Sequence, residues 1–137
     1  MSALPAERPR VLLVDDDARL QHIVGLYLTQ QQFDVTTASG GAEAIAQIED
    51  GLPDLVILDL MMPDVDGFTV CRHLRSTPGG ADVPVIVFTA LSDDADLRAA
   101  REAGATRVVT KPFSLTGLGA AVTALLPDLT EAGEPAS

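Results

Sequence analysis

Short apolar runs rich in Val, Ile and Leu alternate along this chain with longer segments of helical periodicity. Four of the runs end directly in polar residues: Val11–Val14 precedes Asp15 and Asp16, Leu55–Leu58 precedes Asp59, Val85–Phe88 precedes Thr89, and Val108–Thr110 precedes Lys111. Runs of this length and composition are typical of strands that are buried on both faces of a parallel sheet. The alternation therefore predicts an α/β fold built on a doubly wound parallel sheet.

Turn and cap residues divide the chain into five strand-and-helix units. Strands are predicted at residues 10–14, 33–38, 54–58, 85–88 and 106–110, and the second, the weakest of them, is expected at the sheet edge. Helices are predicted after Asp17, after Gly41, from Phe68, after Ser92–Asp94, and over residues 114–126. We expect one domain over residues 10–126, with a flexible arm at 1–9 and a disordered tail at 127–137.

Two helices carry distinctive side-chain patterns. In the first helix, the predicted buried stripe is Leu20, Ile23, Tyr27 and Leu28, and in the last helix it is Leu115, Leu118, Val122 and Leu125. The opposite face of the last helix is small and uncharged, with Thr116, Gly117, Gly119, Ala120, Ala121, Thr123 and Ala124. Such a face permits close approach by a partner, and the alternative is an ordinary solvated surface.

The polar residues at the strand ends are expected to meet. In an open α/β sheet, ligands bind just beyond the carboxyl ends of the strands. Three carboxylates, one hydroxyl and one ammonium at that edge predict a site for a divalent cation and a phosphoryl group, and oxygen ligands of this kind suit Mg²⁺. Taken alone, the first two acids could cap a helix, Thr89 could be a satisfied strand-end hydroxyl and Lys111 a surface lysine. Asp59 is harder to explain in this way, because a buried unpaired carboxylate is costly. Together, the structural explanations require four coincidences.

The same residues give the sequence a resemblance to the receiver domains of two-component response regulators. The matching motifs are Val14-Asp15-Asp16-Asp17, the segment from Leu58 to Gly67, Phe88-Thr89-Ala90, Gly104-Ala105 and Lys111-Pro112-Phe113. They extend from about Arg10 to Leu126. The resemblance implies a flavodoxin-like three-layer sandwich with five parallel strands in the order 2-1-3-4-5.

The resemblance also implies a role for each site residue. Asp59 matches the phosphoacceptor, and Thr89 and Lys111 match the residues that contact the phosphoryl oxygens. Mg²⁺ would be held by Asp16, Asp59 and the backbone carbonyl of Met61, with Asp15 close by or acting through a water. The implied protein is a signalling protein, not an enzyme, that promotes its own phosphorylation and dephosphorylation. Separately, the lack of a signal peptide and of a membrane-spanning run makes a cytoplasmic protein the default expectation.

The implied partners are proteins. A sensor histidine kinase or phosphotransfer protein would supply the phosphoryl group, and the fourth helix, fifth strand and fifth helix would bind a downstream protein or a second copy. Receivers often carry an aromatic switch residue three positions before the lysine, but this chain has Val108 there. A rotating ring therefore cannot report phosphorylation in this chain.

The sequence leaves two alternatives open. The chain could be a fragment of a longer regulator or of a hybrid kinase. It could also be a Mg²⁺-dependent phosphohydrolase of the aspartyl-phosphate type, although such enzymes usually show Asp-x-Asp after the first strand and here the acids are contiguous.

Charge and composition exclude other classes of function. The net charge is -11 with only nine basic residues, which argues against direct nucleic-acid binding. Cys71 is the only cysteine, so an intrachain disulfide is impossible, and its helical spacing predicts a core position. No apolar run approaches the ~20 residues that span a bilayer, and residues 1–9 lack the apolar core of a signal peptide.

Overall fold

A five-stranded parallel sheet forms the centre of the computed structural model, which describes residues 8–90, 93–111 and 114–126. The strands are β1 (Arg10–Val14), β2 (Asp34–Ala38), β3 (Leu55–Leu58), β4 (Val85–Thr89) and β5 (Arg107–Thr110). The helices are α1 (Ala18–Gln30), α2 (Gly41–Asp50), α3 (Gly67–Ser76), α4 (Asp94–Ala103) and α5 (Leu115–Leu125), with a 3-10 turn η1 at Gly80–Asp82. The order β2-β1-β3-β4-β5 confirms the predicted doubly wound fold.

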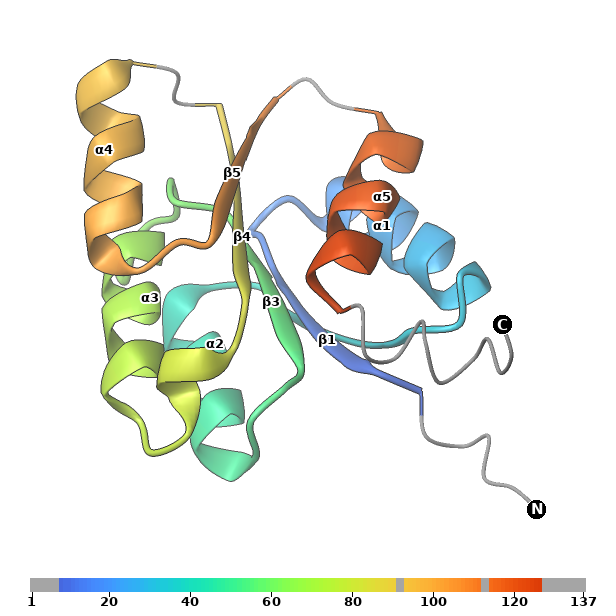
Figure 1. Ribbon diagram of the computed structural model, residues 1–137, viewed down its shortest axis with the longest axis horizontal. Helices are drawn as coiled ribbons and strands as arrows, with labels where there is room; N and C mark the ends of the chain where they lie inside the picture. The colour runs from blue at the N-terminus through green and yellow to red at the C-terminus, as the bar shows by residue number, and fades with distance from the viewer. Residues whose placement is uncertain (1–7, 91–92, 112–113, 127–137) are drawn as a thin grey trace.

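Helices cover both faces of the sheet and make three layers. α1 and α5 lie on one face, and α2, α3 and α4 lie on the other (Figure 1). In β1, Val11 and Leu13 face the α1 and α5 layer, whereas Leu12 and Val14 face the other layer. Every residue of β3 and β4 is buried. This two-sided burial explains why these strands read as continuous apolar runs.

The two edge strands are the exposed ones, as predicted for the second strand. Three of the five residues of β2 are exposed, and β5 has exposed residues at both of its ends. Cys71 is buried in the core, as its spacing predicted. No helix in the described part of the chain is long and apolar enough to cross a membrane.

Some sequence expectations concern residues outside the described ranges. These are the tail at 127–137, residues 1–7 of the arm, Ser92, which was expected to help begin α4, and Pro112 and Phe113 of the motif that begins at Lys111. The last arm residue, Pro9, is described, and its carbonyl accepts a hydrogen bond of 2.8 Å from the backbone N–H of Asp34. This bond continues the β1 and β2 pairing beyond the predicted start of the domain.

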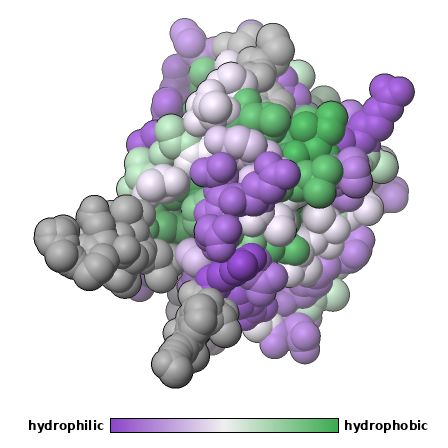
Figure 2. All heavy atoms as spheres, turned by 90° about the vertical axis from the view of Figure 1, so that its right-hand side faces the viewer, coloured by the Kyte–Doolittle hydropathy of each residue, from purple (hydrophilic) through white to green (hydrophobic). Residues whose placement is uncertain are grey.

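The predicted buried face of α1 is wrong at one residue. Val24 and Leu28 are buried, and Leu20 and Tyr27 pack partly against the core, but Ile23 is 51% exposed. Val24, four residues before Leu28, lies where the helix meets the sheet, and Ile23 is turned about 100° away from it. Leu26 is 52% exposed as well. Figure 2 shows apolar surface among polar residues on the side of the molecule that α1 and α5 form.

The predicted small face of α5 is also partly wrong. Leu118 and Val122 are buried as expected, but so are Gly119 and Ala121, which the sequence placed on the open face. A Cβ on Gly119 would lie only 2.8 Å from the Tyr27 ring, so α5 uses this glycine to approach α1. The exposed small residues that remain are Thr116, Gly117, Ala120, Thr123 and Ala124.

Candidate functional site

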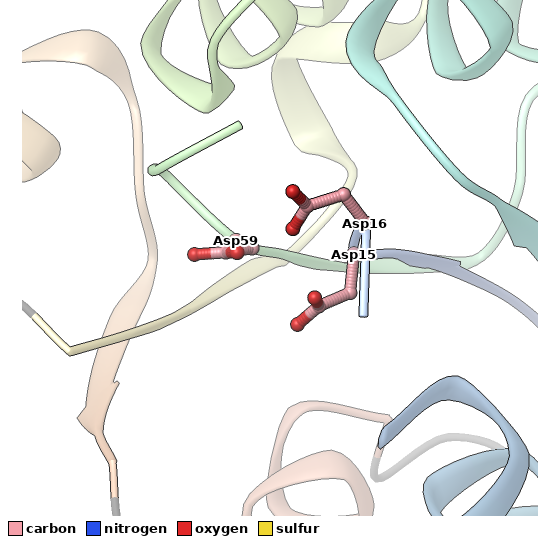
Figure 3. A group of neighbouring side chains, drawn as sticks. All are labelled: Asp15, Asp16 and Asp59. Atoms are coloured by element: carbon pink, nitrogen blue, oxygen red, sulfur yellow. The ribbon is translucent and has the colours of Figure 1, made fainter. Parts of the chain in front are cut away.

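Three aspartates meet where β1 and β3 end. Asp15 and Asp16 follow β1, Asp59 follows β3, and the backbone N–H of Asp59 donates to the carbonyl of Val14 at 3.0 Å. One carboxylate oxygen of each aspartate lies within 4.8 Å of the others. The three side chains extend to the same side of the strand ends (Figure 3). The predicted convergence of these acids is therefore present in the fold.

The two buried aspartates are held by backbone donors. Asp15 and Asp59 are 1% and 5% exposed, whereas Asp16 is exposed. The Asp15 Oδ1 atom accepts from the N–H of Asp17 at 2.8 Å, and the Asp59 Oδ1 atom accepts from the N–H of Met61 at 3.1 Å. Each bond occupies one carboxylate oxygen and leaves Oδ2 directed to the site.

Lys111 lies against both of these Oδ2 atoms. Its Nζ atom is 3.2 Å from Asp15 and 3.8 Å from Asp59. The backbone N–H of Lys111 donates to the carbonyl of Thr89 at 2.8 Å, which ties the end of β5 to the end of β4. Thr89 is fully buried as the last residue of β4. The structure thus places Thr89 at the end of β4, the neighbour of β3, and Lys111 just beyond β5, with its side chain reaching the acids.

Burial raises the pKa of Asp59, because desolvation disfavours its ionised form. The negative charges of Asp15 and Asp16 act in the same direction, while the Met61 N–H and the Lys111 ammonium partly oppose them. A single ammonium shared by two buried acids leaves negative charge uncompensated. The donor set is therefore suited to a small divalent cation with oxygen ligands, and it fits Mg²⁺.

The loop between β3 and α3 packs closely on Asp59. A Cβ on Gly67 would overlap the carbonyl oxygen of Asp59, and the Gly67 N–H donates to the carbonyl of Leu60 at 3.1 Å. Glycine is therefore required for α3 to begin this near the site. The Met61 side chain is 57% exposed, so it contributes nothing to the packing of the acids.

Sequence reasoning missed two residues that border the site. The Gln21 side-chain amide donates to the carbonyls of Asp15 at 2.8 Å and Ala38 at 2.7 Å, which fixes the end of β1 against β2. The Phe88 ring lies under Lys111, with 4.9 Å between Nζ and the ring centroid. The position of Phe88 immediately before Thr89 could have indicated that its ring lies near the site. Nothing in the sequence indicates that the Lys111 side chain extends over that ring.

Sequence comparisons find relatives of this chain among known proteins. A family model described as the response regulator receiver domain matches residues 11–123. The DNA-binding dual master transcriptional regulator RpaA of Synechocystis sp. is 42% identical over 118 residues, which are 86% of this chain and 49% of RpaA. The chain therefore spans about half the length of that relative.

Solved structures with the same fold are also found. The chemotaxis protein CheY4 of Vibrio cholerae superposes with a TM-score of 0.83 at 27% identity, covering 87% of this chain and 99% of CheY4. The receiver domain of the sensor histidine kinase PA1611 from Pseudomonas aeruginosa, which has a magnesium ion coordinated in its active site cleft, gives 0.80 at 26% identity, covering 86% and 97%. By its matched residues, its strand order and its strand-end acids, this chain belongs to the response regulator receiver domain family.

Proposed function

We propose that this chain accepts a phosphoryl group on Asp59 from the phosphohistidine of a sensor histidine kinase or a phosphotransfer protein. The observation that carries the proposal is the environment of Asp59. Its carboxylate is buried, one oxygen is held by the Met61 N–H, and the other faces Lys111 at 3.8 Å. A buried acid whose ionised form is disfavoured, beside a cation at a sheet edge, is typical of a functional group.

The transfer is a nucleophilic displacement at phosphorus. The Asp59 Oδ2 atom, which does not accept the Met61 hydrogen bond, attacks the phosphorus and forms a new P–O bond. The P–N bond of the phosphohistidine breaks, and the imidazole nitrogen leaves with the electron pair and takes up a proton. Phosphoryl transfer of this kind depends on positioning and on neutralising the equatorial oxygens rather than on covalent chemistry.

Two residues of the chain would neutralise those oxygens. Lys111 supplies a point charge, because its ammonium already lies between Asp15 and Asp59. Thr89 supplies a hydroxyl donor from the end of β4, where the Lys111 backbone is bonded to its carbonyl. Both act on charge that develops during transfer, so their loss would slow phosphorylation more than it would weaken donor binding.

Asp16, Asp59 and the backbone carbonyl of Met61 would hold Mg²⁺, with Asp15 beside them. The fit rests on three carboxylates within 4.8 Å of one another, of which Asp16 is open to solvent. When bound, the ion supplies positive charge to a phosphoryl oxygen and relieves the repulsion among the acids. A site with few protein ligands and room for water is the usual arrangement for this ion.

The signal would leave through protein contacts on α4, β5 and α5. The exposed part of α5 is free of charged residues, and Ala120 and Ala124 lie on it. Phosphorylation would shift the population of conformations that this surface adopts. Val108 is partly buried against the α2, α3 and α4 layer and carries no ring, so the shift does not depend on an aromatic switch at this position.

Labelling with acetyl phosphate and Mg²⁺ tests the phosphoacceptor. We expect one phosphoryl group per chain, released by hydroxylamine, on wild type and none on Asp59→Ala. Asp64→Asn is the matched control, because Asp64 is an exposed loop aspartate with a positive φ of 69° that asparagine also adopts. This control should be labelled like wild type.

Labelling of Asp59→Ala at the wild-type level would overturn the assignment. Steady hydrolysis of a generic phosphate ester, with no lasting label on the protein, would instead favour the phosphohydrolase alternative. Transfer from purified histidine kinases then identifies the donor, since a cognate kinase labels Asp59 much faster than the others do.

A further inference from the structure

The Lys111 ammonium rests on the face of the Phe88 ring as well as between two acids. The distance from Nζ to the ring centroid is 4.9 Å, within the ~6 Å over which a cation is attracted to an aromatic face. The ring is 1% exposed, and the lysine side chain is 25% exposed. Removal from water strengthens this attraction, so a ring at this depth is a substantial partner for the charge.

The β4 strand explains why the ring lies there. Phe88 is paired with Val109 in the register of β4 and β5, and its side chain packs in the α1 and α5 layer with Leu13 and Ile57. Lys111 directly follows β5, and its Nζ atom lies over the Phe88 ring and 3.2 Å from Asp15. The Phe88 ring therefore contacts the ammonium with one face, and its packing in the core fixes its position.

The ring differs from the two acids in what happens to it during phosphoryl transfer. Asp15 and Asp59 belong to the acidic group that would receive the cation, and Asp59 would carry the phosphoryl group, so neither offers the lysine a constant charge. The Phe88 ring takes part in neither event. As a buried core side chain, it can keep its contact with Lys111 in each state of the site.

We propose that Phe88 is a positioning residue that keeps the Lys111 ammonium over the site while its carboxylate partners change state. The proposal rests on the proposed phosphorylation of Asp59, and it adds a residue to that site which acts through Lys111 and touches no phosphoryl oxygen.

Fluorinated phenylalanine at position 88 tests this with only a small change in the volume of the buried ring. Fluorine withdraws electron density from the ring face, so mono-, tri- and pentafluoro-phenylalanine weaken the attraction in steps. The same replacements at Phe33, which is buried in the same α1 and α5 layer, are the matched control. Lys111 is the only lysine of the chain, so isotope-labelled lysine gives one set of side-chain NMR signals.

We expect two results from the full chain. In the metal-free protein, the ring-current shift of the Lys111 methylene protons decreases as fluorine is added at position 88 and stays constant when fluorine is added at position 33. The rate of phosphorylation by acetyl phosphate falls stepwise to about a third to a tenth of wild type at position 88 only. Thermal unfolding of both series checks that the core is intact.

Equal rates and unchanged lysine shifts in the two series would overturn the role of Phe88 while leaving phosphorylation of Asp59 in place. Absence of any label on wild type would overturn the proposed function instead, and the metal-free NMR series would still show whether the lysine lies against the ring. A lysine shift that responds while the rate does not would limit the contact to the resting protein and reject the positioning role.

Discussion

At the scale of single residues, the site carries uncompensated negative charge before any ligand binds. Asp15 and Asp59 are both buried, and one lysine ammonium lies between them. Burying an ionised carboxylate without full compensation costs folding free energy, so the fold retains Asp59 at the expense of stability. Such an arrangement is expected where a residue is kept for its chemistry.

Asp59→Asn should therefore stabilise the metal-free protein at neutral pH. Burial raises the pKa of Asp59 above its ordinary value of 3.8, so the folded chain binds this proton more tightly than the unfolded chain. The resulting stability is fully present below the ordinary value and is lost as pH rises through the raised one. Urea unfolding in EDTA between about pH 4 and about pH 8 should show the variant's advantage growing with pH.

The control for this series is Asp64→Asn, which removes the same formal charge from an exposed loop position. Its stability should follow that of wild type across the range. An advantage of Asp59→Asn that is the same at every pH would mean that the gain comes from something other than ionisation of Asp59.

Asp16→Asn should separate metal binding from folding. Asp16 is exposed, so we expect the free energy of unfolding to change by less than about 0.5 kcal/mol. Loss of a direct carboxylate ligand should weaken Mg²⁺ binding at least about tenfold, measured by isothermal titration calorimetry. Asp17→Asn is the neighbouring control, since an asparagine keeps the cap that Asp17 provides to the N–H groups of Arg19 and Leu20. Equal Mg²⁺ affinity of the two variants would remove Asp16 from the metal site.

At the scale of secondary structure, the sequence was informative where one physical rule acts alone. Apolar runs located β1, β3 and β4, and the polar residue after each run located the site, because parallel strands place their carboxyl ends at one edge. Helix faces were harder to predict. Ile23 and Val24 are both β-branched and adjacent, and only the seating of α1 on the sheet decides which of them is buried.

The position of Gly119 shows the same limit. From the sequence, Gly119 was placed on the open face of the helix. In the structure it is the point where α5 packs against the Tyr27 ring of α1. The ring under Lys111 was missed for a related reason, since the path of a long lysine side chain depends on residues from three different strands. Contacts between elements far apart in the chain carry no local pattern.

Gly119→Ala should destabilise the protein although alanine is the better helix former. Helix propensity alone favours alanine over glycine by up to about 1 kcal/mol. The added methyl group would press on the Tyr27 ring, and overpacking of this kind costs about 1–3 kcal/mol.

Gly25→Ala in α1 is the control, because a Cβ there meets no atom within 4 Å. In urea unfolding the control should be more stable than wild type, and the Gly119 variant should be less stable. Equal stabilisation by both would show that α1 and α5 are not in close contact.

At the scale of the whole molecule, charge limits where two copies of this chain could associate. The chain carries 20 acidic and nine basic residues, so most surfaces of two copies repel each other. Residues 114–126 contain no charged side chain, and five small residues of α5 remain exposed after Gly119 and Ala121 are used inside the fold. This surface can approach a partner without desolvating charge, which is the main cost of burying a polar interface.

Ala120→Glu and Ala124→Arg should each weaken association through α5 while phosphorylation of Asp59 stays at the wild-type rate. Both alanines are exposed, so neither change disturbs the core. With a beryllofluoride mimic of the phosphoryl group, we expect wild type to associate with a partner or a second copy about 5- to 150-fold more tightly, the range of a typical allosteric coupling. Cross-linking and light scattering should show at least about a tenfold loss of affinity for both variants. Ala42→Glu, an exposed alanine on α2, is the matched control and should behave like wild type.

The two variants introduce charges of opposite sign, so the experiment distinguishes two kinds of contact. A close contact between small residues rejects a glutamate and an arginine alike, because either charge would be desolvated. If the arginine strengthens association while the glutamate weakens it, the contact is a charge-steered one with an acidic partner, and the small uncharged surface of α5 is not its cause. If both variants associate like wild type, the exposed face of α5 is only solvated surface, and the signal leaves through α4 or β5.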